Sequence, residues 1–270
     1  MVSGGILDID SLVYTYGDKT VLDMISLNIK KGEILGILGP NGCGKTTLLK
    51  NLNKNLHPHG GCVMIDGSDI EEMSKKDIAR KISVVPQSNE IRFAFTVRDI
   101  VGMGRMPFQE SLRGASSDDM KITERAMEQT GIISMADRHI NTMSGGERQR
   151  AIIARAVAQT PEIVLMDEPT LHLDINMQFE VLDLMKRLAH DNNLTVVIVS
   201  HDLPMVTRYC DRIMLIHEHK LFAVGTPEDV LTEENMKTVF NVDALFEKDP
   251  RTGTNTVRLF GSCGGRDFSI

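Results

Sequence analysis

The chain has 270 residues, of which 41% are hydrophobic and 25% are charged, a balance that suits one large domain with a sizeable core. The formal net charge of −7 argues against a nucleic acid as a partner held by general electrostatics. Because the first residues lack a signal-peptide pattern and no apolar run is long enough to span a bilayer, we expect a cytoplasmic protein that needs another subunit for any work at a membrane.

The first predicted elements are two strands with alternating apolar residues, at 6–14 and 21–29, joined by a turn at 16–19. We expect them to form an antiparallel hairpin. Residues 33–38 then form a short apolar run that predicts a buried strand, and residues 47–52 have the pattern of a helix.

The loop between this strand and this helix fits the pattern G-x-x-x-x-G-K-[ST] without a gap. Its glycines have no side chain, so the backbone N–H groups can approach phosphates at the positive end of the following helix. Lys45 offers a positive charge to the outer phosphates, and Thr46 offers a hydroxyl to Mg²⁺. The sequence therefore predicts a nucleotide site built from Gly39, Pro40, Asn41, Gly42, Cys43, Gly44, Lys45, Thr46 and Thr47.

The middle of the chain changes character after residue 87. A short strand at 62–65 and a buried strand at 82–85 precede that point, but from 88 to about 159 we find helical patterns and no convincing strand. We therefore predict a helical subdomain at 88–159, inserted into an α/β core of residues 1–87 and 160–240.

The core resumes with apolar strands at 163–166 and 195–199, which have the continuous pattern of a buried parallel sheet, separated by a helix at 174–190. Two short strands follow within 212–224, and a helix begins near 226. Residues 241–270 form a C-terminal extension with weak signals, and we expect its glycine-rich end, 261–265, to be frayed. The four cysteines include no C-x-x-C pair, which argues against a zinc site or a disulfide framework.

Two acidic residues, Asp167 and Glu168, follow the strand at 163–166, where ligands of open α/β sheets bind. In a chain with a phosphate loop we expect Asp167 to orient hydrated Mg²⁺. We expect Glu168 to orient and deprotonate the attacking water. A second anion site is predicted at residues 144–149, because Ser144 and the two glycines after it stand at the start of a helix.

These segments, in this order, resemble the ATP-binding cassette (ABC) ATPases. The phosphate loop, Gln87 after a strand, Ser-Gly-Gly-Glu at 144–147, the strand ending at Asp167 and Glu168, and His201 after the next strand cover nearly the whole chain. The resemblance implies a P-loop NTPase of the α/β class, with a RecA-like parallel-sheet core, an N-terminal antiparallel β subdomain and an inserted α-helical subdomain.

The resemblance also implies roles for individual residues. Two copies would pair head to tail, with each ATP between Lys45 of one copy and the signature segment of the other. Gln87 would sense Mg²⁺ and water, His201 would contact the γ-phosphate, and Tyr16 would stack on adenine. The signature segment consists of Ser144, Gly145, Gly146 and Glu147.

Residues 96–105 with Pro107, residues 144–150, and residues 249–253 resemble ATPase subunits of importers for iron-siderophores, haem and vitamin B12. Molybdate or tungstate importers share these features, so the cargo stays open. The implied partners are membrane permease subunits and, indirectly, a substrate-binding protein, with no nucleic acid. The ATPase would then lie on the inner face of the membrane. The rival classes are a soluble non-transport ABC ATPase and an exporter ATPase.

Four local features lead to further expectations. Met143 stands where the family usually has Leu, a harmless swap, and Leu171 stands where a small polar residue is usual. We expect the helix N-terminus to favour the thiolate of Cys43. Residues 87–105 include apolar side chains at 91, 93 and 95 that either pack on their own subdomain or form a cleft for a permease helix.

Overall fold

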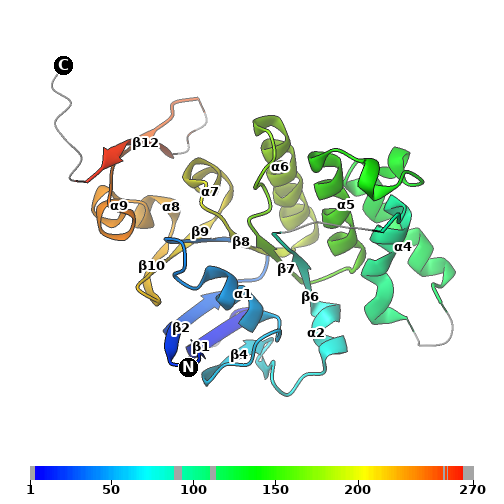
Figure 1. Cartoon of the computed structure of the whole chain (residues 1–270), viewed down its shortest axis with the longest axis horizontal. Coiled ribbons are helices and arrows are strands. Elements are labelled where there is room, and N and C mark those ends of the chain that lie inside the picture. Colours follow the sequence, from blue (N-terminus) through cyan, green and yellow to red (C-terminus); the bar gives the residue numbers. More distant parts are fainter. Residues whose placement is uncertain (1–3, 88–92, 110–113, 252, 254, 264–270) are drawn as a thin grey trace. The chain divides into compact units, whose positions relative to one another are not determined.

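A computed structural model describes residues 4–87, 93–109, 114–251, 253 and 255–263 of the chain. The chain divides into two compact units, the first within residues 1–67 and 199–270, and the second within residues 68–198. Figure 1 labels the elements of both, and each unit is described by itself.

The first unit contains β1 (Leu7–Tyr16), β2 (Lys19–Ile29), β3 (Ile34–Leu38), α1 (Lys45–Leu52), β4 (Gly60–Ile65), α7 (Leu203–Tyr209), β9 (Arg212–His217), β10 (Lys220–Gly225), α8 (Pro227–Val230), α9 (Glu233–Phe240), β11 (Val242–Lys248) and β12 (Asn255–Ser262).

The second unit contains β5 (Ser68–Asp69), α2 (Lys75–Lys81), β6 (Ile82–Val85), α3 (Val97–Gly102), the 3₁₀ helices η1 (Met103–Phe108), η2 (Ile133–Met135) and η3 (Ile140–Thr142), α4 (Ser117–Gln129), α5 (Gly145–Ala158), β7 (Ile163–Asp167), α6 (Ile175–Asn192) and β8 (Thr195–Val199, of which Val199 falls in the first unit).

The predicted N-terminal hairpin is confirmed, since β1 pairs antiparallel with β2 and, on its other side, with β4. Its strands are longer than the sequence pattern indicates, because pairing continues to Tyr16 and Lys19 and leaves a tight turn at Gly17-Asp18. Apolar side chains along β1 and β2, such as Leu12 and Ile25, are fully buried and anchor this layer.

The strand that leads into the phosphate loop, β3, is buried at all five positions and pairs parallel with β9. β9 pairs antiparallel with β10, as expected for two short strands around a turn. Because β3 is buried along its length, the loop that follows it starts from a rigid support.

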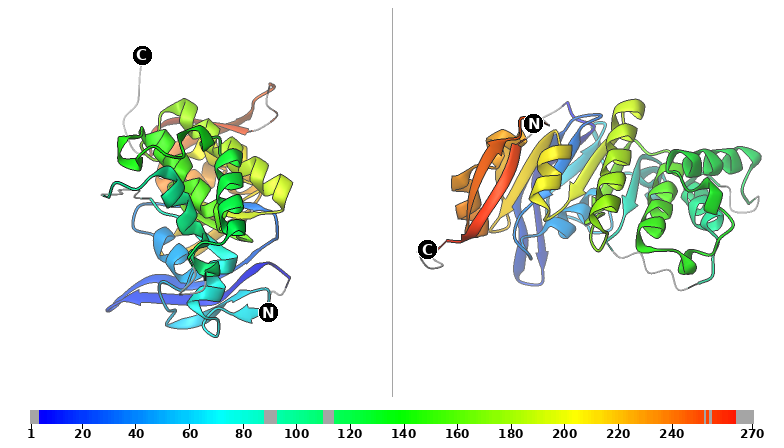
Figure 2. Two further views of the ribbon diagram at one scale, coloured as in Figure 1. Left: turned by 90° about the vertical axis from the view of Figure 1, so that its right-hand side faces the viewer. Right: turned by 90° about the horizontal axis from the view of Figure 1, so that it is seen from above.

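The C-terminal extension, which has weak sequence signals, contains an antiparallel hairpin of β11 and β12. β12 includes Gly261 and Ser262, so these two residues of the segment expected to be frayed belong to a strand. Asn241, in the left-handed conformation (φ 54°), ends α9 and turns the chain into β11, and the N–H of Cys263 donates to its carbonyl oxygen at 2.9 Å. The hairpin packs on α9 and α7 (Figure 2). Of the predicted frayed segment, residues 264 and 265 lie outside the described part.

In the second unit, β6 and β7 pair parallel, and the neighbouring strands run in the order β8-β7-β6. The described residues between 93 and 159 contain helices and no strand, apart from an isolated bridge between Thr96 and His139. α3, α4 and α5 pack against one another, and Figure 1 labels α4 and α5. The predicted helical segment is therefore present, while its exact limits as a subdomain stay a prediction.

A buried ion pair fastens these helices together. The Arg105 Nε lies 2.9 Å from Asp119 Oδ1, and Arg105 Nη1 donates to the carbonyl of Ala158 and to the hydroxyl of Thr160. The hydrogen bond from Arg105 lowers the pKa of Asp119. Removing either partner would leave a buried charge uncompensated, so we expect this pair to stabilise the contact of η1 with α4 and with the end of α5.

No helix in the described part of the chain has both the length and the apolar character needed to cross a membrane.

Candidate functional site

The phosphate loop passes from β3 to α1 and is pressed against the neighbouring strands. A Cβ on Gly39 would lie 2.3 Å from the carbonyl oxygen of Ile216, and one on Gly44 would lie 2.5 Å from that of Val21. Gly44 also has φ +112°, so both space and backbone conformation require glycine there. Gly44 is the N-cap of α1 and no side chain caps this helix, which leaves its first N–H groups to a ligand.

Lys45, only 8% exposed, points back into the loop. Its Nζ donates to the carbonyl oxygens of Gly39 at 2.7 Å and Pro40 at 3.0 Å. Thr46, the next residue of α1, is exposed. The loop thus holds an ammonium group and a hydroxyl side by side at a helix N-terminus, as the sequence predicts for a phosphate site.

The expectation of a thiolate at Cys43 is wrong. The side chain is 5% exposed, and this burial raises the pKa of the thiol, an effect larger than the opposite effect of the nearby Lys45 charge. The prediction considered the effect of the helix N-terminus on the thiol and left out the effect of burial. The loop is closely packed here, since a Cβ added at Gly39 would lie 2.8 Å from Cys43 Sγ. A thiol reagent is therefore a poor probe of this loop.

His201 follows β8 and lies in the same unit as the loop. The N–H of the preceding residue, Ser200, donates to the carbonyl oxygen of Ile37 in β3, which places this segment beside the strand that enters the loop. Asp202 caps α7 by accepting from the N–H of Met205 at 3.1 Å, and its own N–H donates to Ser200 Oγ. The His201 side chain is exposed.

Tyr16, at the end of β1, is 49% exposed and meets Tyr14 edge to face with ring centroids 5.0 Å apart. Tyr14 in turn contacts His59. Because the ring contacts Tyr14 and about half of the residue remains exposed, Tyr16 can offer a stacking surface. Its contact with adenine stays a prediction.

In the second unit, β7 delivers Asp167, which is buried, and then Glu168, which is partly exposed. Glu168 has φ +50°, an uncommon conformation for a non-glycine residue that is often found at functional positions. The N–H of Leu171 donates to the carbonyl oxygen of Glu168 at 3.1 Å, so a tight turn re-aims the chain immediately after the acid.

Gln87 lies at the same sheet edge as these acids. Val85 of β6 pairs with Met166 of β7, so the residues that follow both strands leave the sheet at neighbouring positions. Gln87 is exposed. The strand register is therefore consistent with the prediction that Gln87 senses the Mg²⁺ that Asp167 is expected to orient.

The signature segment begins α5 with a complete capping box. The N–H of Glu147 donates to Ser144 Oγ at 3.3 Å, and the N–H of Ser144 donates to Glu147 Oε2 at 2.8 Å. This backbone hydrogen bond is the main cause of a lowered pKa for Glu147, whose carboxylate also lies 3.4 Å from Arg138 Nη1. The exposed Ser144 hydroxyl accepts one bond and retains a hydrogen that it can donate to an anion.

Met177 of α6 packs against the signature segment, a contact that the sequence analysis does not predict. A Cβ on Gly146 would lie 2.7 Å from Met177 Sδ, so α5 approaches α6 closely at this glycine. Leu173, from the loop after Glu168, lies 4.0 Å from the position of a Cβ on Gly145. The signature segment and the loop after Glu168 are thus packed neighbours. A glycine in the first turn of a predicted helix was the available signal.

The structure therefore gathers the predicted residues in two groups. The first unit holds the phosphate loop, His201 and Tyr16, and the second holds Gln87, Asp167, Glu168 and the signature segment. Among the described residues, no three His, Cys, Asp or Glu side chains cluster to hold a metal ion by themselves.

Comparisons with known proteins find similar chains among ATP-binding proteins. The model of the family described as ABC transporter matches residues 22–171. A probable siderophore transport system ATP-binding protein of Bacillus subtilis (strain 168) is 39% identical over 245 residues, which cover 91% of this chain and 89% of that protein. An achromobactin transport ATP-binding protein of Dickeya dadantii (strain 3937) is 39% identical over 250 residues, covering 93% of each.

Among solved structures, a metal-chelate type ABC transporter in an inward-facing conformation contains a similar chain, with a TM-score of 0.84 and 28% sequence identity. The match covers 96% of this chain and 98% of that one. The predicted fold class, a P-loop NTPase with a RecA-like core, is confirmed by this likeness.

Proposed function

The chain belongs to the ABC transporter family, and from this membership we propose that it powers an importer for a metal chelate of the iron-siderophore, haem or cobalamin type. As a member it is an ATP-binding protein and an ATPase. The main support is that this chain is 39% identical to a probable siderophore transport system ATP-binding protein. The same chain contains a phosphate loop at an uncapped helix end and a Ser-Gly-Gly signature.

In the proposed reaction, the carboxylate of Glu168 takes a proton from water while the water oxygen attacks the γ-phosphorus of ATP. The bond from that phosphorus to the bridging oxygen of the β-phosphate breaks, and ADP and phosphate leave. Lys45 and the loop N–H groups hold the phosphates, and His201 contacts the transferred group. The turn after Glu168, closed by the bond from Leu171, supports a fixed direction for this acid.

We assign Mg²⁺ to oxygen ligands of this chain. The Thr46 hydroxyl, the Gln87 amide oxygen and the Asp167 carboxylate are the hard ligands that Mg²⁺ prefers, and this ion does not need a cage of several protein side chains. The metal would neutralise charge on the phosphates. Asp167 places a buried carboxyl group at the end of β7, and carboxyl oxygens are ligands that a hard cation accepts.

The active form is proposed to be a head-to-tail pair of copies. Ser144 and Gly146 of one copy would bind the ATP that is held by Lys45 of the other. The exposed Ser144 hydroxyl and the N-terminal end of α5 can add hydrogen bonds to a phosphate that another surface already holds. Tyr16 would stack on the adenine ring of the nucleotide held in its own copy.

The substitution Glu168→Gln tests the ATPase assignment because it keeps the shape of the side chain and removes the base. Hydrolysis should fall by roughly 10²–10⁴-fold, measured as phosphate release. ATP binding should persist, and the ATP-bound dimer should accumulate in size-exclusion chromatography. Near-normal hydrolysis by the variant would remove Glu168 from the role of base.

The surface proposed to bind a permease lies on the second unit. Phe93 is 71% exposed, Phe95 is 36% exposed, and their rings meet with centroids 6.1 Å apart. Phe95 also lines a groove of about 590 Å³, together with Met103, Met106 and Met120. This exposure favours a partner over packing within the chain, the alternative considered from sequence. Residue 91 lies outside the described part.

We propose that a cytoplasmic helix of the permease lays its apolar face in this groove. Methionine side chains adapt to partner surfaces, and the charged Arg98 and Asp99 at the same groove can orient the helix. Through this contact the protein would lie on the inner face of the membrane, and a substrate-binding protein would deliver the cargo to the permease.

Replacing Phe93 and Phe95 by Ser should separate two activities. Basal ATPase of the isolated subunit should persist, while co-purification with the permease and cargo uptake should both drop. Ile133→Ser, which removes another exposed apolar residue of the same unit away from this groove, is the control and should retain uptake. Uptake at the wild-type rate by the double variant contradicts the proposal. Uptake assays with molybdate in parallel discriminate the alternative cargo.

A further inference from the structure

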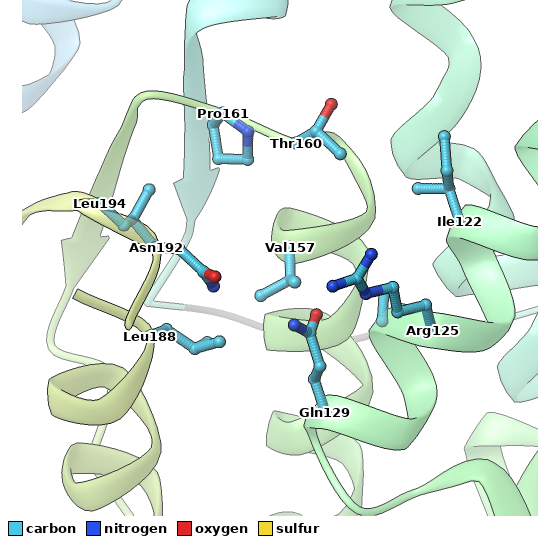
Figure 3. Close-up of a pocket in the computed structure, with 10 residues that line it drawn as sticks. Ile122, Arg125, Gln129, Val157, Thr160, Pro161, Leu188, Asn192 and Leu194 are labelled. Carbon is cyan, nitrogen blue, oxygen red and sulfur yellow. The ribbon is translucent and has the colours of Figure 1, made fainter. Parts of the chain in front are cut away.

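A second pocket, distinct from the groove above, opens in the second unit. It has a volume of about 320 Å³ and lies among α4, the C-terminal end of α5 and the C-terminal end of α6 (Figure 3). None of the residues proposed to bind ATP, Mg²⁺ or the permease lines it. Its volume is at the lower end of the range for small-molecule sites.

Three polar side chains converge on this pocket. Figure 3 shows the guanidinium of Arg125 and the amides of Gln129 and Asn192 pointing toward the space beside Val157. Within the described part of the chain, none of these three side chains makes a hydrogen bond or an ion pair with another residue. Their donors are therefore available to a ligand, and they come from two helices that face each other across the pocket.

The rest of the lining is mostly apolar. Val157, Leu188 and Leu194 form much of it, and Leu188 and Leu194 are buried. The hydroxyl of Thr160 accepts a hydrogen bond from Arg105 and is turned away from the space in Figure 3. A ligand would thus meet apolar side chains in the pocket together with polar groups from both α4 and α6.

Charge selects the class of ligand. Arg125 is the one charged residue among the ten that line the pocket. A guanidinium presents a planar fork that matches a carboxylate with two parallel hydrogen bonds. A phosphate dianion would find a single exposed guanidinium for its two charges, and a cationic amine would be repelled.

We propose that this pocket binds a small organic monocarboxylate with an apolar body. The carboxylate would accept hydrogen bonds from Arg125 and from the amide groups of Gln129 and Asn192, while the apolar part would lie against Val157 and Leu188. This binding site is independent of the proposed transport function, because it requires neither ATP nor a permease.

The test uses the full chain labelled at isoleucine, leucine and valine methyl groups, observed by NMR. The probes are hexanoate, benzoate and phenylacetate, each with its primary amide as an uncharged match. The methyl groups of Val157, Leu188 and Leu194 should shift and saturate with the carboxylates, in the millimolar range expected for ligands of this size. The amides should bind about three- to tenfold more weakly.

A matched pair of variants identifies the group that reads the carboxylate. Arg125→Gln should remove the preference for carboxylate over amide, and because Arg125 is exposed the variant should fold normally. Arg187→Gln, which removes an exposed arginine of α6 that lies outside this pocket, should leave the preference unchanged. Gln129→Leu should weaken carboxylate binding by a smaller factor than Arg125→Gln.

The proposal is overturned if the three methyl groups show no saturable shift with any carboxylate, or if amides bind as tightly as carboxylates. It is also overturned if Arg125→Gln retains the wild-type preference. Loss of ATPase in a Glu168 variant has no bearing on these shifts, so the two proposals fail separately.

Discussion

The phosphate loop in the first unit and the signature segment in the second both place a helix N-terminus where an anion can bind, but a side chain caps only the second. Gly44 begins α1 without any side-chain acceptor. Ser144 begins α5 with a capping box in which Glu147 takes part. The first N–H groups of α1 have no side-chain acceptor and can bind a ligand, while Ser144 accepts a hydrogen bond from one N–H group of α5.

This difference teaches how two similar motifs serve different tasks. An uncapped helix end surrounded by a tight backbone cradle is suited to bind phosphates by itself. A capped end is stable without a ligand and adds only what the exposed Ser144 hydroxyl and the remaining N–H groups can supply. This difference fits the proposed pairing of copies, in which the phosphate loop of one copy binds ATP and the signature segment of the other adds hydrogen bonds to it.

The largest expected effect tests the tightness of the cradle. Gly44→Ala would bring a Cβ within 2.5 Å of the Val21 carbonyl oxygen at φ +112°. We expect the free energy of unfolding to fall by roughly 2–5 kcal/mol, as measured by denaturant unfolding, because steric overlap adds to backbone strain.

Gly42→Ala is the matched control in the same loop. Gly42 also has positive φ, +80°, but an added Cβ would meet nothing within 4 Å. We expect a loss of about 1–2 kcal/mol from strain alone. If both variants lost the same unfolding free energy, steric overlap at Gly44 would not be the cause of its loss.

A smaller effect is expected at the signature segment. Gly146→Ala would press on the side chain of Met177, which can move, and would gain helix propensity of about 1 kcal/mol. We expect the free energy of unfolding to change by less than about 1 kcal/mol. Gly145→Ala, whose Cβ would have 4.0 Å to its neighbour, serves as the control and should be neutral or stabilising. If Gly146→Ala lost as much unfolding free energy as Gly44→Ala, the two helix ends would be equally intolerant of a side chain, contrary to our expectation.

The smallest effect concerns the capping box. The pKa of Glu147 is lowered in the folded protein, mainly by the hydrogen bond from the Ser144 N–H, so the folded state favours the carboxylate. Its contribution to stability is therefore present above the unfolded pKa, about 4.5, and is lost as pH falls through the lower folded value. Other carboxyl groups titrate there too, so the measurement is a difference between proteins.

We expect Glu147→Gln to be less stable than the wild type by about 0.5–1 kcal/mol at neutral pH, and this difference should shrink as the pH falls below about 4. Thermal unfolding followed by circular dichroism over a range of roughly pH 3–7 measures it. A difference that stays constant across this range would mean that the charge of Glu147 does not support the cap.

The parts that could be predicted from the sequence are those with local signals. The strand, loop and helix around Lys45 follow from a glycine pattern between two apolar segments, and Ser144 with Glu147 is a recognisable capping box. α7 was missed although its signals were present, since Asp202 is a capping residue and Pro204 stands in the first turn.

Other features depend on residues far apart in the chain. The burial of Cys43 follows from the contact of Gly39 with Ile216, and no local pattern reports it. The support of Gly146 by Met177 likewise requires the packing of α5 on α6. The hairpin β11–β12 escaped prediction because β12 is largely exposed and β11 only partly buried, so neither strand shows a clear alternation of apolar residues.

The contacts of Lys45 have a consequence for how the protein selects its nucleotide. Its ammonium group donates hydrogen bonds to two carbonyl oxygens of its own loop. In the proposed site, an incoming phosphate would therefore compete with these internal acceptors. Measured affinity is then a difference between two sets of hydrogen bonds. A nucleotide with fewer phosphates would offer Lys45 fewer oxygen atoms in exchange for these two carbonyl groups. Discrimination between ATP and shorter nucleotides would thus begin inside the chain, before any second copy takes part.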